Sequence, residues 1–223
     1  MAQRVEPSLR ERKKQRTREL LVEAAIGLCL RQGFEQTTVE QIAAAAEVSP
    51  RTFSRYFATK EAVVLAFVDE VVDQVAVELT AQPMGIGDIE ALYRAHVQAF
   101  LNTRAAAPGR LTADRLVASA RIVTSSPALM QSVAEFRVDA VNAVLARRMG
   151  VDPGDRRLKL TSVVWGAIAV TAIAELASEA DWDSVQVEHI VARLQRAYAD
   201  FLAVVAGVRH PRRAASIDCD YLL

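Results

Sequence analysis

The sequence has few of the residues that cross-link a chain or break its helices. Its 223 residues include two cysteines, seven prolines and nine glycines, and aromatic residues make up 6%. Cys29 lies in an apolar helical pattern and Cys219 in a polar tail. A disulfide framework is therefore not expected, and a reducing cytoplasm is.

Long apolar runs are also missing. The longest segment without a charged residue, Leu160 to Ala174, is shorter than the roughly 20 residues that span a bilayer. The N-terminus is basic but lacks the apolar stretch of a signal peptide. We therefore expect a cytoplasmic protein with no membrane partner.

The motifs of common enzyme and metal sites do not occur. The sequence has no H-E-x-x-H, no phosphate-binding loop, no G-x-S-x-G and no C-x-x-C, and only three histidines. We therefore expect no catalytic residue, no metal and no cofactor, and the chain is not predicted to be an enzyme.

The charges balance overall but are unevenly distributed. Lysine and arginine equal aspartate and glutamate at 27 each, yet residues 1–60 hold 11 basic and 7 acidic residues. A zero net charge argues against a protein that coats nucleic acid over its whole surface. The basic N-terminal part predicts one region that meets a polyanion.

Helical periodicity with few turn signals predicts an all-α fold of about nine helices. The expected spans are 16–32, 38–46, 50–57, 59–81, 88–106, 110–124, 127–149, 155–180 and 183–207. The organisation that follows is a basic flexible arm (1–15), a unit of three short helices (16–62), a longer helical part (63–207) and a loose tail (208–223).

The first three helices have the spacing of a helix-turn-helix unit. Thr38 and Gln41 form a capping-box pattern, and Ser49 followed by Pro50 marks the start of the next helix. The motif covers about 38–57, and its second helix is the one that enters the major groove of DNA. The alternative is an ordinary corner of a helical bundle, but the caps, the turn and the basic face agree with one another.

The exposed side of the third helix offers Arg51, Thr52, Arg55 and Tyr56. Arginine can bond guanine, threonine can reach a phosphate or a thymine methyl, and tyrosine can donate to a phosphate. In the basic arm, Lys13, Lys14 and Arg16 are further candidates for DNA contact. A solvated tail is the alternative for the arm.

The stretches 37–43 and 48–62 resemble the TetR family of DNA-binding regulators, with Gly33 and Phe34 where that family has a Gly-Phe pair. The resemblance implies phosphate contacts by Thr38, Tyr56 and Lys60, and base and backbone contacts by Arg51, Thr52 and Arg55. Two residues depart from the family pattern. Glu47 replaces a usual glycine, which would cost roughly 1 kcal/mol in a left-handed conformation, and Ser54 replaces a common tyrosine.

The same resemblance implies that residues 16–62 are a DNA-binding domain and residues 63–207 a regulatory and dimerisation domain. It also implies a homodimeric repressor that a small molecule releases from a palindromic operator. A second possibility is a protein of the same fold without an effector, controlled by a partner protein or by abundance. The last two helices would form the dimer interface, through Val164, Trp165, Ile168, Leu194, Tyr198 and Phe201. The alternative for them is an internal core.

Residues 116–176 are similar to the regulatory domain of mycofactocin-type TetR regulators, which are associated with acyl-CoA-like ligands. A small apolar or acyl-CoA-like effector is therefore expected. The candidate pocket residues are Tyr93, His96, Phe100, Arg121 and Arg137. A core or rim position is the alternative for His96, and a protein carboxylate is an alternative partner for Arg137.

Overall fold

The computed structural model describes residues 8–106, 111–136, 138–178 and 181–209, and in these residues every regular element is a helix. The all-α prediction is confirmed. The α-helices are α1 (Leu9–Gln32), α2 (Val39–Ala45), α3 (Pro50–Ser54), α4 (Lys60–Val64), α5 (Ala66–Thr80), α6 (Asp88–Asn102), α7 (Ala113–Thr124), α8 (Pro127–Ala134), α9 (Asp139–Met149), α10 (Arg156–Ala174) and α11 (Val187–Arg209). Short 3-10 helices are η1 (Thr103–Ala105), η2 (Glu175–Ser178) and η3 (Trp182–Ser184).

Helix α1 begins earlier than expected. The prediction of a flexible arm over residues 1–15 is wrong for residues 8–15, while residues 1–7 lie outside the described residues. The Ser8 hydroxyl accepts from the Glu11 amide at 3.3 Å, and the Glu11 carboxylate accepts from the Ser8 amide at 2.7 Å. This capping box starts the helix, and the Arg, Lys, Glu and Gln residues that follow are good helix formers.

Two of the expected helices are each divided into two, so the nine predicted helices correspond to eleven α-helices in the described residues. The span 59–81 divides into α4 and α5 at Leu65, whose carbonyl accepts from the Val68 amide at 2.8 Å in a tighter turn. The span 127–149 divides into α8 and α9. Helix α11 continues to Arg209, and the rest of the predicted loose tail, 210–223, lies outside the described residues.

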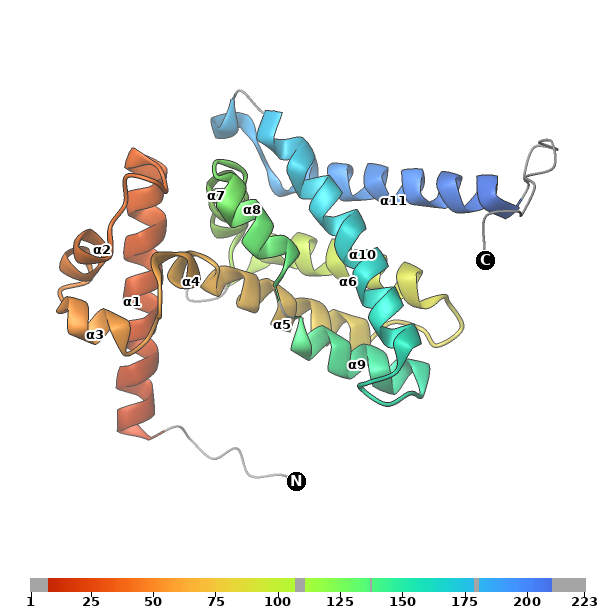
Figure 1. Ribbon diagram of the computed structural model, residues 1–223, viewed down its shortest axis with the longest axis horizontal. Coiled ribbons are helices and arrows are strands. Elements are labelled where there is room, and N and C mark those ends of the chain that lie inside the picture. Colours follow the sequence, from red (N-terminus) through yellow and green to blue (C-terminus); the bar gives the residue numbers. More distant parts are fainter. Residues whose placement is uncertain (1–7, 107–110, 137, 179–180, 210–223) are drawn as a thin grey trace, which may run out of the picture.

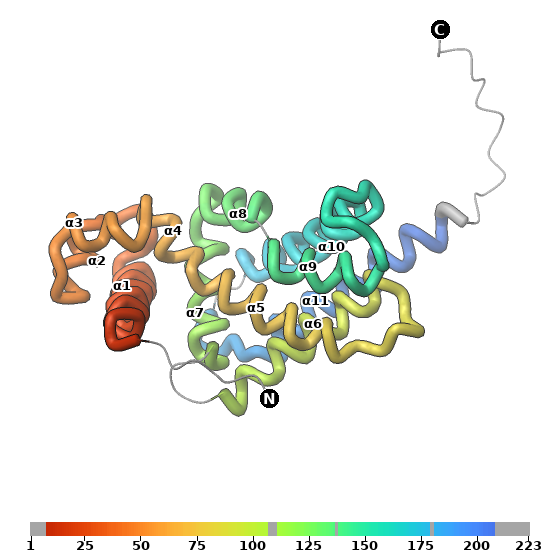
Figure 2. The backbone as a smooth tube through the Cα atoms, turned by 90° about the horizontal axis from the view of Figure 1, so that it is seen from below, coloured from red at the N-terminus to blue at the C-terminus, as the bar shows by residue number. Residues whose placement is uncertain are grey.

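The helices gather into two bodies. Helices α1 to α4 form the smaller one, and α5 leads from it into the larger one formed by α6 to α11 (Figures 1 and 2). The smaller core is built around Leu21, Ile42 and Phe53, and the larger one around Leu92 and Leu145. The far end of α11 extends away from both bodies (Figure 1).

The smaller core also includes residues from the larger body. Ile122 and Leu129, from α7 and α8, are buried in it. Beside them, the Ser126 hydroxyl donates to the Glu35 carboxylate at 2.9 Å. Helix α7 therefore contacts α1 directly, and Ser126, just before α8, holds the segment that follows α1, in addition to the covalent link through α5.

Residues 156–178, which are α10 and η2, are long and apolar enough to cross a membrane by length and composition alone. The core helix of a globular protein passes the same test. One side of α10 does lie in the larger core, through Leu158 and Ala172. Its opposite side carries the exposed Leu160 and Val163.

Candidate functional site

Helices α2 and α3 are fixed by caps and by a small buried set of side chains. The Thr38 hydroxyl accepts from the Gln41 amide at 3.2 Å, and the Gln41 side-chain oxygen accepts from the Thr38 amide at 3.0 Å. The Ser49 hydroxyl caps α3 by accepting from the Thr52 amide at 3.1 Å. Ile42 and Phe53 are buried where the two helices cross. The predicted caps are confirmed.

The turn between these helices passes through Glu47 at a φ of +55°. The Glu47 amide donates to the Ala44 carbonyl at 3.1 Å, and the next amide, of Val48, donates to Ala43 at 2.9 Å. These bonds hold a left-handed residue that lacks the freedom of glycine, at a cost of roughly 1 kcal/mol. The departure from the family pattern at Glu47 therefore leaves the turn intact.

Helix α3 presents a basic face. Arg51, on α3, and Arg55, the residue that follows this helix, are exposed and lie four positions apart. The Arg55 guanidinium carbon lies 5.7 Å from the centroid of the Tyr56 ring. The Thr52 hydroxyl lies 3.0 Å from that of Ser49. Two exposed cations, one aromatic hydroxyl and one threonine thus lie close together.

A groove joins this face to the start of α1. It has a volume of about 910 Å³ and is lined by Leu9, Arg10, Lys13, Lys14, Thr17, Arg55 and Tyr56. Cations from two separate helices therefore surround one hollow, an arrangement that suits a polyanionic backbone. Arg16 is not among the lining residues, and its guanidinium lies 4.0 Å from the Glu19 carboxylate.

Lys60, which the sequence predicted as a phosphate contact, has hydrogen-bond partners within the protein. Its ammonium donates to the carbonyls of Phe34 at 3.0 Å, Thr37 at 3.2 Å and Glu35 at 3.3 Å, and lies 4.3 Å from the Phe34 ring centroid. A lysine ammonium has three N–H donors, and all three are directed to the protein. Lys60 fixes the connection between α1 and α2, and we propose this role for it in place of a DNA contact.

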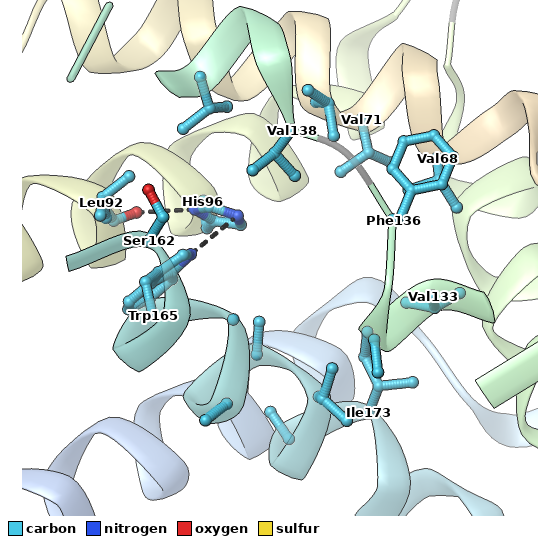
Figure 3. A pocket seen from close by; sticks show the side chains of 18 of the residues that line it. Val68, Val71, Leu92, His96, Val133, Phe136, Val138, Ser162, Trp165 and Ile173 are labelled. Atoms are coloured by element: carbon cyan, nitrogen blue, oxygen red, sulfur yellow. Dashed lines mark hydrogen bonds between the residues drawn. The ribbon is translucent and has the colours of Figure 1, made fainter. Parts of the chain in front are cut away.

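The larger body encloses an apolar cavity of about 680 Å³ between α5, α6, α8, α9, α10 and α11 (Figure 3). The predicted His96 and Phe100 line it. Most of the remaining wall is aliphatic or aromatic, including Val68, Val71, Leu92, Val133, Phe136, Val138, Trp165 and Ile173. A cavity of this size and character accepts a small molecule.

His96 is held neutral in the wall of the cavity. Burial lowers its pKa to about 4, against a smaller opposing effect of its hydrogen bond to the Leu92 carbonyl. Its Nδ1 lies 2.8 Å from that carbonyl oxygen, and its Nε2 accepts from the Trp165 indole N–H at 3.2 Å. Since the carbonyl requires a donor, the proton of the neutral ring is on Nδ1.

The other predicted pocket residues do not line the cavity. Tyr93 stacks on Tyr198 with the ring centroids 4.3 Å apart. Arg121 is exposed and pairs with Asp183 at 3.3 Å. Both assignments were wrong, because the partners that hold these side chains lie 105 and 62 positions away in sequence. Arg137 lies outside the described residues.

Comparison with known proteins identifies the family of this chain. A family model described as "Bacterial regulatory proteins, tetR family" matches residues 21–67. The HTH-type transcriptional regulator TcmR of Streptomyces glaucescens is 34% identical over 181 residues, which are 79% of this chain and 80% of TcmR. The chain belongs to the tetR family. It is a DNA-binding transcriptional regulator and not an enzyme.

Solved structures of tetR-family proteins are similar to this chain as well. Thermus thermophilus FadR, a repressor solved in complex with lauroyl-CoA, is 21% identical, with a TM-score of 0.46 and coverage of 89% of this chain and 98% of FadR. FadR from Bacillus halodurans is 18% identical, with a TM-score of 0.47 and coverage of 83% and 94%.

The structure corrects the predicted interface residues of this tetR-family chain. Trp165, Ile168 and Leu194 are buried in the protomer's own core, with exposed fractions of 5, 6 and 2%, so a partner cannot reach them. Val164, Tyr198 and Phe201 are half-buried and pack against the same core. The large apolar side chains that α10 and α11 leave exposed are instead Leu160, Val163, Leu202 and Val204.

Sequence reasoning missed residues at both sites. Arg10 and Thr17 belong to the groove, and the Ser8–Glu11 capping pattern was the signal that would have placed them on a helix. Asn142 and Ser162 are polar residues of the cavity wall. They carry no signal in the sequence, since nothing local indicates that α9 and α10 bring them together.

Proposed function

We propose that the protein is a homodimeric repressor that binds a palindromic operator in the cytoplasm and leaves it when a small apolar effector occupies the cavity. The observation that carries this proposal is the groove in which cations of α1 and α3 face one hollow. In this proposal Arg51, Thr52 and Arg55 read bases or adjacent backbone in the major groove.

The start of α1 supplies the contacts to the DNA backbone. Lys13 and Lys14 line the groove beside Tyr56, and each phosphate that they neutralise releases counterions. Thr38 is exposed at the start of α2 and retains its assignment as a phosphate contact. Arg16 lies outside the groove and near Glu19, so we assign it a smaller contribution.

A second copy would cover the exposed side of α10 and α11. One recognition helix reads only a few base pairs, so two are needed, separated by about 34–36 Å to reach successive major grooves. Leu160, Val163, Leu202 and Val204 supply apolar surface that has no partner within the protomer. Their exposure supports a homodimer built on these two helices.

Helix α8 connects the cavity with the smaller body and could transmit the effect of ligand binding to it. Leu129, in its first turn, is buried with the DNA-binding helices, whereas Val133 and Ala134, at its other end, line the cavity. The Ser126–Glu35 hydrogen bond precedes it. An effector that displaces the cavity end of α8 would therefore shift the contact with α1, a coupling typically worth 1–3 kcal/mol.

DNA selected from a random pool, with and without a library of metabolites, tests the proposal. We expect an inverted repeat to be enriched and at least one apolar compound to release it. Enrichment of an inverted repeat that no compound releases would favour control by a protein partner or by abundance. Failure to enrich any sequence would refute the operator assignment.

A further inference from the structure

The two ends of the cavity differ in chemistry. His96, Trp165 and Ser162 lie together at one end, while Val68, Val133 and Ile173 line the other (Figure 3). The apolar end is the one formed by α5 and α8, which lead to the DNA-binding helices. A ligand that fits both ends has an apolar body and a polar group at one extremity.

His96 and Trp165 satisfy each other's hydrogen-bonding groups. The indole N–H is used by His96 Nε2, and the protonated Nδ1 is used by the Leu92 carbonyl. The rings lie 4.8 Å apart between centroids. They therefore offer a ligand their ring surfaces, and neither has a free N–H to donate.

Asn142, by contrast, has a free donor. The Ser162 hydroxyl donates to the Asn142 side-chain oxygen at 2.6 Å, a distance typical of an O–H···O bond. This bond orients the amide, so its Nδ2 points away from Ser162. In the described part of the chain Nδ2 has no hydrogen-bond partner, and Asn142 lines the cavity.

We propose that Asn142 selects the effector, through a hydrogen bond from its Nδ2 to a neutral carbonyl oxygen at one end of an otherwise apolar molecule. The effector class is therefore an apolar ketone, ester or amide, whose body lies along α5 and α8. The inference rests on the proposed function, because it assumes that the cavity is the effector site. It narrows the broader expectation of an apolar or acyl-CoA-like ligand.

Binding of two matched probes to the full-length protein tests this inference. The probes are 2-decanone, which is neutral and accepts a hydrogen bond, and decanoate, which has the same number of carbons and a negative charge. Trp165 lines the cavity, so its fluorescence reports occupancy when Trp182→Phe removes the other tryptophan. The rise in melting temperature with each probe serves as a second readout.

Asn142→Asp is the sharpest variant, because it keeps an oxygen for Ser162, removes the donor and places a negative charge beside the ligand's carbonyl oxygen. We expect it to weaken 2-decanone about tenfold. Asn142→Leu removes the donor without adding charge, and we expect a loss of about three- to tenfold. Val138→Ala, which removes two methyl groups from the apolar wall and leaves the Asn142 donor in place, is the control and should weaken both probes alike.

Unchanged 2-decanone affinity in both Asn142 variants would overturn the inference. Tighter binding of decanoate than of 2-decanone by the unaltered protein would overturn it as well. Failure of both probes to bind would also overturn it. DNA binding measured on the same samples separates the two proposals, since a protein that binds its selected DNA but no probe retains the proposed function and loses only this inference.

Discussion

Replacing Lys60 by methionine removes charge-assisted hydrogen bonds while keeping most of the side chain's length and packing. The ammonium donates to three carbonyls at 3.0, 3.2 and 3.3 Å and lies over the Phe34 ring. Lys60 is half-buried, so the bonds are partly screened by solvent. We expect Lys60→Met to lower the free energy of unfolding by about 2–3 kcal/mol.

Lys14→Met is the matched control, because it removes the same charge from the groove between α1 and α3, where Lys14 is exposed. We expect the control to unfold at an unchanged denaturant concentration. It should instead lower the slope of log K against log salt by about 0.9, the value for one phosphate contact. Lys60→Met, measured under conditions where it is folded, should keep the original slope.

Chemical denaturation and fluorescence anisotropy with labelled DNA at several salt concentrations give both quantities. The reasoning is refuted if Lys60→Met unfolds like the unaltered protein and loses salt dependence. That result would restore the phosphate contact that the sequence predicted for Lys60.

Four further predictions follow from single residues. Glu47→Gly should raise the free energy of unfolding by about 0.5–1 kcal/mol, because the relief of the left-handed strain exceeds the added chain entropy; a decrease in urea melts would contradict this. Arg55→Ala should weaken operator binding by about 1–3 kcal/mol and leave random DNA nearly unaffected; equal losses on both would make it a phosphate contact. His96 has a pKa of about 4 in the folded protein, below its value in the unfolded chain, so acid favours unfolding. The free energy of unfolding should therefore be highest above about pH 6.5 and fall by about 2 kcal/mol towards pH 5. His96→Gln should remove this fall in the free energy of unfolding, and a variant with the same pH profile as the unaltered protein would contradict the prediction. Leu202→Asp should sediment as a monomer. Val77 is an exposed apolar residue on α5, and Val77→Asp should remain a dimer; if both variants are dimers, the interface lies elsewhere.

Local signals in the sequence sufficed for the DNA-binding helices. The Thr38 and Ser49 caps, the left-handed residue at Glu47 and the buried Phe53 all lie within about fifteen residues of one another. Their hydrogen bonds join neighbours in the chain, so the pattern of residue types determines the geometry. The Ser8 capping box is equally local and was within reach of the same reasoning.

Long-range contacts are the part of the structure that the sequence could not indicate. The carbonyls that hold Lys60 lie 23 to 26 positions before it, and no pattern in the sequence indicates that they converge. Helix α10 is apolar on both sides, so periodicity could not distinguish the side with Trp165, which is buried, from the side with Val163, which is exposed. The cavity is lined from six helices, and only the fold brings Asn142 and Ser162 together.

The affinity of a double variant, Lys13→Gln with Arg55→Ala, for DNA selected by the unaltered protein tests the central claim most directly. The two residues lie on different helices and line one groove. We predict a loss of at least about 100-fold in affinity with an unchanged melting temperature. The control variant, Arg147→Ala with Arg156→Ala, removes two exposed charges from the larger body. It should bind DNA as the unaltered protein does. Equal affinities for the two double variants would contradict the assignment of the groove as the DNA-binding surface.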